Sequence, residues 1–197
     1  MKMNCIPHAL ATTALCLLAG IMAFAADEKL AQPQTTKHRI IGLCSPDRQE
    51  DLRHVVQKIP EVQLLGIDFD KAEVSFSYDL AKLFPTAKAK QVFTVEQVAE
   101  RLDNLLRNAS GGSFTLRPAS TGPLEKLTVV EFQIGILDCK GCRLGAYQAI
   151  ARMDGVDRAT VDSKDGRLTA WIDPAKTDRA AIEAALKKAR VELPAKE

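Results

Sequence analysis

The sequence has little of several features that identify common classes of protein. Of its 197 residues only 5% are aromatic and one is tryptophan, and 27 basic against 25 acidic side chains give a formal net charge of +2. A near-neutral chain without an aromatic stripe offers no surface typical of nucleic-acid or anionic-membrane binding. It also lacks a Ser-His-Asp set, a paired acid and base, and a phosphate-binding loop. We therefore expect no enzymatic activity and no nucleic-acid partner.

Long hydrophobic runs are also scarce, apart from one at the N-terminus. Residues 9–23 are almost wholly apolar, follow the basic Lys2, and end at Ala23-Phe24-Ala25, which fits the small-residue cleavage pattern of secretory signals. The run is short for a membrane-spanning helix. We predict a signal peptide over 1–25, export across the inner membrane to the periplasm, and membrane contact only through that peptide.

Cysteine is the third scarce residue. Cleavage after Ala25 would leave Cys44, Cys139 and Cys142. Three thiols are too few for a disulfide-stapled scaffold, and their number is odd. Two of them form a close pair, Cys139-Lys140-Gly141-Cys142, between an apolar run expected as a strand (128–134) and a segment with helical spacing.

Thiols at such a strand-to-helix turn can converge on one soft ion or form a small disulfide loop. We expect Gly141 to let the loop fold tightly, because glycine tolerates unusual backbone angles. The helix N-terminus, together with Lys140 and Arg143, is expected to favour thiolate over thiol.

An internal repeat with an offset of 94 residues organises the rest of the chain. Each copy has apolar residues at i, i+3, i+4 and i+7, which predict an amphipathic helix: Leu52, Val55, Val56 and Ile59 in the first copy, and Ala146, Ala149, Ile150 and Met153 in the second. A strand, a polar turn and a second strand then follow, the second strand at Glu73–Tyr78 or Arg167–Ile172.

A second helix and a last strand complete each copy. Thr94 and Gln97 predict a capping box before the helix of the first copy, and Thr177 is expected to cap a helix over 178–188 in the second. The last strands are expected at 113–117 and 190–193.

The order β-α-β-β-α-β, twice, predicts an α+β protein of two tandem ferredoxin-like βαββαβ sandwiches. The first is a degenerate copy, because Cys44 has no partner thiol. The expected organisation is a signal peptide (1–25), a polar tether (26–37), the degenerate copy (38–117), a linker (118–126) and the thiol-bearing domain (127–193).

The thiol pair in this setting resembles the heavy-metal-associated (HMA) domain family, over about 127–193. That family includes copper chaperones, the N-terminal domains of metal-transporting ATPases and a periplasmic mercury carrier. Its motif, G-M-x-C-x-x-C, falls here on residues 136–142, with Leu137 in place of the usual methionine. The resemblance also covers the Asp-Gly-Val link at 154–156, whereas Arg190-Val191 replaces the residues that the family usually has beside the metal loop.

The resemblance implies an exported metal carrier, chaperone or sensor that binds Cu(I) or Zn(II) at Cys139 and Cys142 and exchanges it with a metal-transporting ATPase or another thiol-bearing acceptor. Asp138 is a candidate third ligand, typical of zinc-type rather than copper-type relatives, or an ordinary loop cap. Two alternatives remain open: a redox or structural Cys139–Cys142 disulfide, and a non-metal interaction module.

Other candidate residues receive plainer interpretations. Cys44 is expected to be a buried free thiol, with a third-thiolate role or a disulfide bridge in a homodimer as alternatives. His38 and His54 are expected on the surface, and Tyr147 and Trp171 in or near the core.

Overall fold

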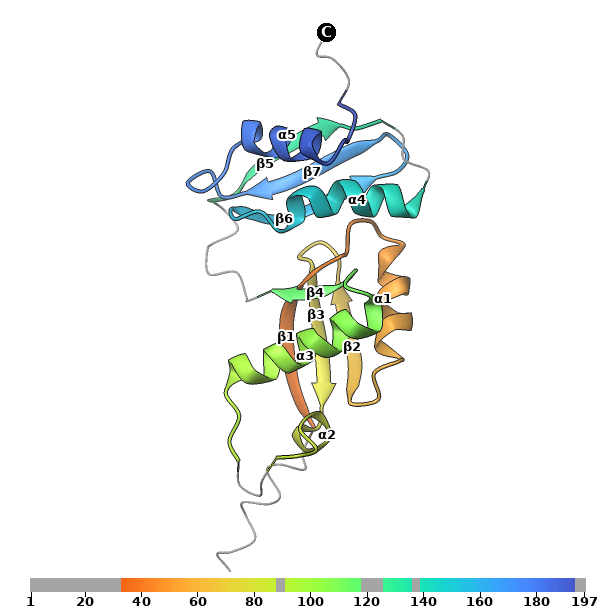
Figure 1. Ribbon diagram of the computed structural model, residues 1–197, viewed down its shortest axis with the longest axis vertical. Coiled ribbons are helices and arrows are strands. Elements are labelled where there is room, and N and C mark those ends of the chain that lie inside the picture. The colour runs from red at the N-terminus through yellow and green to blue at the C-terminus, as the bar shows by residue number, and fades with distance from the viewer. Residues whose placement is uncertain (1–32, 88–90, 118–125, 136–138, 194–197) are drawn as a thin grey trace, which may run out of the picture.

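The computed structural model describes residues 33–87, 91–117, 126–135 and 139–193. They form an α+β protein with two antiparallel sheets, one in each half of the chain, as the sequence predicts (Figure 1). The described residues 33–117 are called the first half and 126–193 the second half. None of the helices in these ranges is long and apolar enough to cross a membrane. The predicted signal peptide and most of the predicted linker lie outside the described residues.

The sheet of the first half has the strand order β2-β3-β1-β4. Its strands are β1 (Gln34–Ile41), β2 (Val62–Asp68), β3 (Glu73–Tyr78) and β4 (Thr115–Arg117). Alternation along β3 sends Val74, Phe76 and Tyr78 into the core, where each is less than 5% exposed. One face of this sheet is therefore apolar and must be covered.

Two long helices cover that face: α1 (Arg48–Val56) and α3 (Val95–Ser110). Thr94 and Gln97 make the predicted capping box reciprocally, and Gly111 ends α3 in the left-handed conformation. Between β3 and α3, the short helix α2 (Leu80–Leu83) precedes a stack of Phe84 on Phe93 with ring centroids 3.9 Å apart.

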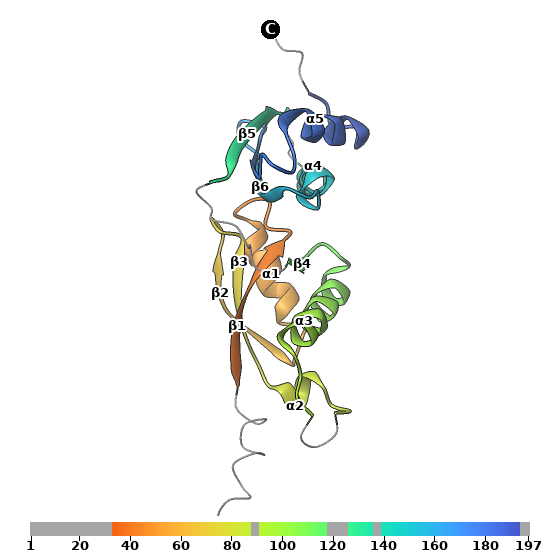
Figure 2. The ribbon, with the colours of Figure 1, turned by 90° about the vertical axis from the view of Figure 1, so that its left-hand side faces the viewer.

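The sheet of the second half has the order β5-β7-β6, with strands β5 (Thr128–Gln133), β6 (Val156–Asp162) and β7 (Arg167–Ile172). Helices α4 (Lys140–Ala151) and α5 (Arg179–Lys188) lie on one side of it (Figure 2). Leu168, Ala170 and Ile172 alternate into the core beneath these helices and are at most 2% exposed.

Three details differ from the sequence predictions. The strand β1 begins at Gln34, inside the expected tether, because Thr35 and Thr36 extend the ladder to β3 without an apolar pattern. Asp178, not Thr177, caps α5 by accepting the N–H of Ala181 at 2.8 Å. Residues 190–193 form no strand, because Arg190 takes a positive φ of 60° and turns the chain after α5.

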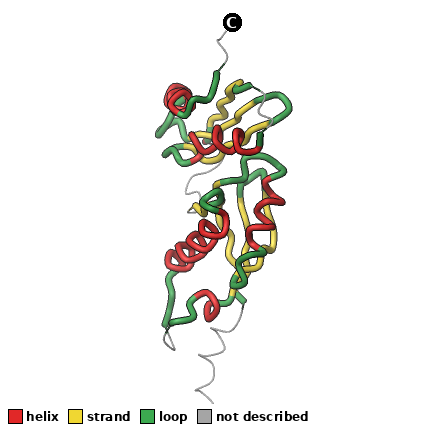
Figure 3. The backbone as a smooth tube through the Cα atoms, turned by 45° about the vertical axis from the view of Figure 1, so that its right-hand side comes forward, coloured by secondary structure: helices red, strands yellow, loops and turns green. Residues whose placement is uncertain are grey.

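The two halves stack along the long axis of the molecule, with α4 lying across the end of the first half (Figures 1 and 3). The apolar core of the second half includes Ile41 and Cys44 from the first half. A cavity of only about 10 Å³ lies between the halves, among Arg39, Tyr147 and Asp157. This is barely the space of one water molecule, so the interface is close-packed.

Candidate metal centre

The thiol pair lies at the beginning of α4. Cys139 is the N-cap residue, and its Sγ accepts the backbone N–H of Cys142 at 3.3 Å. Both thiols are free and exposed. A sulfur atom thus occupies the place that a Ser or Asp oxygen usually takes at a helix start, where the helix dipole favours negative charge. This confirms the expected interaction of the helix N-terminus with the thiol of Cys139.

The two thiols are not equivalent. A hydrogen bond from the Cys142 side chain, followed by the Cys142 N–H, lowers the pKa of Cys139 below its ordinary value. The same side-chain hydrogen bond raises the pKa of Cys142, because losing its proton breaks the bond. The charge of Arg143 acts to lower the pKa of both thiols, as expected, but the hydrogen bond to Cys139 outweighs it at Cys142. The lowered pKa makes Cys139 the more readily deprotonated thiol of the pair.

Gly141 does not play the expected role. It lies within α4 without a positive φ, so the turn needs no backbone angle special to glycine. A Cβ at this position would stand 3.5 Å from the Sγ of Cys139. The glycine instead keeps the space beside that sulfur open.

Lys140 and Arg143 face the first half of the protein. The Nζ of Lys140 lies 3.4 Å from Oδ2 of Asp47 and 3.7 Å from Oδ1 of Asp51. The NH2 group of Arg143 lies 3.3 Å from the same Oδ2 of Asp47, and its side chain is only 9% exposed. Two carboxylates of the first half thus partly balance the charges that flank the thiols.

Asp138, the candidate third ligand, lies outside the described residues. Within the described part of the chain, no group of three or more His, Cys, Asp or Glu side chains is arranged to hold a metal ion. The described donor set is thus two thiols, and two thiolates suffice for the linear coordination of Cu(I).

The other candidate residues lie apart from the thiol pair. Cys44 is 1% exposed, as expected of a buried free thiol, and burial raises its pKa. Trp171 is half-buried, with the guanidinium of Arg158 4.0 Å from its ring centroid. His54 is exposed, as expected.

His38 corrects a prediction, because it is 9% exposed rather than on the surface. Its ring lies 2.8 Å from Oγ1 of Thr36 and near Phe76, and burial lowers its pKa. Strand alternation places His38 on the same face as Ile40, which is the signal that would have shown its burial.

Residues of the first half form hydrogen bonds with both α4 and β6. The hydroxyl of Tyr147 accepts the N–H of Gly42 at 3.0 Å, and the N–H of Val161 donates to the carbonyl of Cys44 at 2.7 Å. Burial raises the pKa of Tyr147 to about 12, so the hydroxyl stays protonated. Gly42 has φ of +120°, and a Cβ there would stand 2.4 Å from the carbonyl of Ser113, so only glycine fits.

Two arginines complete this contact. Arg39 forms a bidentate pair with the carboxylate of Asp157 at 2.5 and 2.7 Å, and both side chains are less than 10% exposed. Arg117 donates to the carbonyl of Val156 at 2.6 Å and to that of Ala151 at the end of α4. Both ends of α4 are therefore anchored to the first half, the thiol end through Asp47 and the far end through Arg117.

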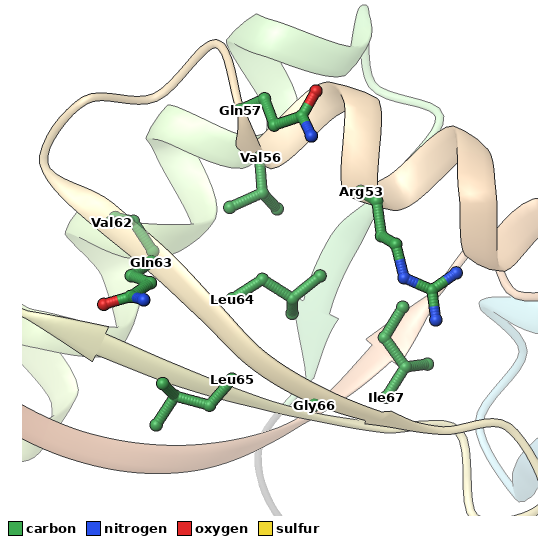
Figure 4. A pocket seen from close by; sticks show the side chains of 9 residues that line it. All are labelled: Arg53, Val56, Gln57, Val62, Gln63, Leu64, Leu65, Gly66 and Ile67. Carbon is green, nitrogen blue, oxygen red and sulfur yellow. The ribbon is translucent and has the colours of Figure 1, made fainter.

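A groove of about 390 Å³ lies elsewhere, between α1 and β2 (Figure 4). Val56, Leu64 and Ile67 line it together with Arg53 and two glutamines. Its lining contains no cysteine, histidine or carboxylate, so the groove offers no ligands for a soft metal.

The chain matches no protein-family model and no curated protein. Solved structures similar to it include the water-soluble region of the P-type ATPase CopA from Bacillus subtilis, with a TM-score of 0.32 and 14% identity over 83% of this chain and 91% of that one. A solution structure of the N-terminal soluble domains of the same protein gives a TM-score of 0.29, 14% identity, and coverage of 81% and 90%. A solution structure of a copper form of CopA gives 0.30, 27% identity, and coverage of 34% and 88%. TM-scores of this size do not establish a shared fold.

Proposed function

We propose that this protein is an exported carrier or sensor that takes one soft metal ion, Cu(I) or Zn(II), as cargo on Cys139 and Cys142. The supporting observation is the pair of free, exposed thiols at the N-terminus of α4, with the Sγ of Cys139 bonded to the Cys142 N–H. Soft thiolates select these ions, and the helix end stabilises their negative charge. Export to the periplasm rests on the sequence of residues 1–25.

Both halves fit the ferredoxin-like plan in our proposal. The order β2-β3-β1-β4 is that of a split βαβ sandwich, and β5-β7-β6 reproduces three of its four positions. The strand order, with the thiol pair at the start of the first helix in the second half, supports assignment to the HMA family as a degenerate copy followed by one that has the thiol pair.

Capture would begin at Cys139, whose lowered pKa makes it the readier thiolate. Cys142 then releases its proton and becomes the second ligand. Because both sulfurs are exposed, thiols of an acceptor such as a metal-transporting ATPase can attack the bound ion and displace them one at a time. No bond to carbon forms or breaks, so transfer is ligand exchange rather than enzymatic turnover.

Metal titration of the reduced protein without residues 1–25 tests the proposal. We expect one Cu(I) per chain, none in the variant with Cys139→Ser and Cys142→Ser, and one in Cys44→Ser, since Cys44 is buried. Circular dichroism of the metal-free form should match that of the loaded form, because both cores are apolar. Full binding by the double serine variant would refute the site.

Asp138 decides the choice of metal in this proposal. If its carboxylate is a ligand, Asp138→Ala should weaken Zn(II) binding by roughly 10–100-fold and leave Cu(I) affinity nearly unchanged. Equal loss for both metals would indicate that Asp138 only shapes the loop.

A second function, thiol–disulfide exchange, is favoured by the unequal pKa values of Cys139 and Cys142, since one exposed activated thiolate beside a protonated thiol can attack a disulfide. A catalytic oxidant would have a reduction potential of about −120 to −180 mV and would refold a substrate protein with scrambled disulfides. We expect no such turnover from this protein. Rapid refolding that is lost in Cys139→Ser would favour this second function.

A further inference from the structure

Asp47, at the beginning of α1, has unusual hydrogen-bond and ion-pair partners for a residue in that position. It is the residue before the first helical turn, where an aspartate normally accepts a backbone N–H of its own helix. Here its side chain makes no such bond. Its Oδ1 accepts the hydroxyl of Ser45 at 2.5 Å, and its Oδ2 faces the other half of the protein.

That oxygen meets both cations that flank the thiol pair. Oδ2 lies 3.4 Å from Nζ of Lys140, which stands between the two cysteines, and 3.3 Å from NH2 of Arg143, which follows Cys142. The Arg143 side chain is 91% removed from solvent, whereas Lys140 is 59% exposed. A buried guanidinium is stabilised by a carboxylate partner, so the Asp47 contact contributes to holding the first turn of α4 in place.

We propose that Asp47 is a positioning residue of the metal site, supplied by the first half of the chain. It fixes the turn from Cys139 to Cys142 through Lys140 and Arg143, so that the two thiols keep the spacing needed to bind one ion. The inference rests on the proposed function and assigns to the degenerate copy a part in the site itself.

Two effects oppose each other when the carboxylate is removed. Without Asp47, the charges of Lys140 and Arg143 are less balanced and favour a negatively charged metal–dithiolate, whereas the loosened turn separates its ligands. Both thiols and Lys140 are exposed, so water and salt screen the part of the first effect that comes from Lys140. Loss of a residue that orients ligands commonly lowers metal affinity by 10-fold or more, so the second effect dominates.

The test is competition for Cu(I) with a chromophoric chelator, using the reduced full mature chain. Asp47→Asn should lower Cu(I) affinity roughly 10-fold while one ion still binds at saturation. Asp47→Glu should restore most of it. Glu50→Gln is the matched control, because it alters an exposed ion pair on the same helix, with Arg53, and should leave Cu(I) affinity unchanged.

Amide hydrogen exchange of the metal-free protein gives a second readout. In Asp47→Asn, we expect protection to fall at residues 140–143 and to persist at the Tyr147 end of α4. Unchanged or tighter Cu(I) binding in Asp47→Asn, or an equal loss in Glu50→Gln, would overturn the inference. Failure of the proposed function appears differently, as metal retained in the double serine variant.

Discussion

The two strand-to-helix turns of this chain occupy the same place in the repeat but differ in their exposure to solvent. With the offset of 94, Ser45 and Arg48 stand where the second copy has Cys139 and Cys142. The first turn is buried, with Leu43, Cys44 and Ser45 all less than 5% exposed, whereas both thiols of the second are exposed. The first turn therefore packs into the core, whereas the second exposes two thiols to solvent.

Arg48 helps to hold the first turn against its own core. Its guanidinium lies 4.3 Å from the ring centroid of Phe114, and its Nε donates to the carbonyl of Gly42 at 3.1 Å. An arginine in the position of the second thiol thus ties the turn to its own core. Residues of this turn and of α1 also contact α4 and so support the second turn.

The largest expected difference between the turns is in thiol reactivity. In reduced metal-free protein, iodoacetamide should modify Cys139 and Cys142 readily, and Cys44 more than about 1,000-fold more slowly, because Cys44 reacts only when the structure opens. Mass spectrometry of the labelled peptides measures this, with urea-unfolded protein as the control. Similar native rates for all three thiols would mean that the first turn is not closed.

Breaking the Arg39–Asp157 ion pair between the halves should cause the largest loss in the free energy of unfolding. Asp157→Ala leaves the buried Arg39 without its carboxylate, and we expect a loss of about 3–5 kcal/mol in urea unfolding. Asp165→Ala is the control, since its pair with Arg167 is nearly half exposed and should contribute less than about 1 kcal/mol. Equal losses would show that the halves do not depend on each other.

Removing a single hydroxyl tests the same contact more finely. Tyr147→Phe leaves the buried N–H of Gly42 without its acceptor and should cost about 1–3 kcal/mol in unfolding free energy. Cu(I) stoichiometry should stay at one per chain. A stability equal to that of the parent would mean that the turn shifts to find another acceptor.

The smallest effect distinguishes the two exposed thiols. Because the pKa of Cys139 is lowered and that of Cys142 raised, labelling of Cys139 should increase at lower pH than labelling of Cys142. In Cys139→Ala, the midpoint of Cys142 should fall toward that of an ordinary cysteine, since the acceptor of its hydrogen bond is gone. Identical midpoints in the parent protein would contradict the asymmetry.

Local patterns predicted much of the fold. Alternating apolar residues predicted Glu73–Tyr78 and Arg167–Ile172 with the bounds that the strands have, because each strand has one covered face. The capping box of Thr94 and Gln97 was also predicted, since both its bonds join residues three apart. The start of α4 at the thiol pair follows from the same kind of local signal.

Contacts between distant segments were not predictable in this way. Arg39 and Asp157 are 118 residues apart, and each alone reads as an ordinary surface charge. The role of Asp47 gave no local signal, because its carboxylate contacts Arg143, which is 96 residues away. Residues 190–193 were wrongly predicted as a strand because Val191 and Leu193 alternate, although both pack on the core from an irregular segment.

The hydrogen bond from Val161 to the carbonyl of Cys44 also bears on how the protein avoids aggregation. β6 is an edge strand of its sheet, and an exposed edge invites pairing with a strand of another molecule. The first half covers this edge by occupying the N–H of Val161. Variants that separate the halves should therefore leave the edge of β6 open to pairing with another molecule as well as lose stability.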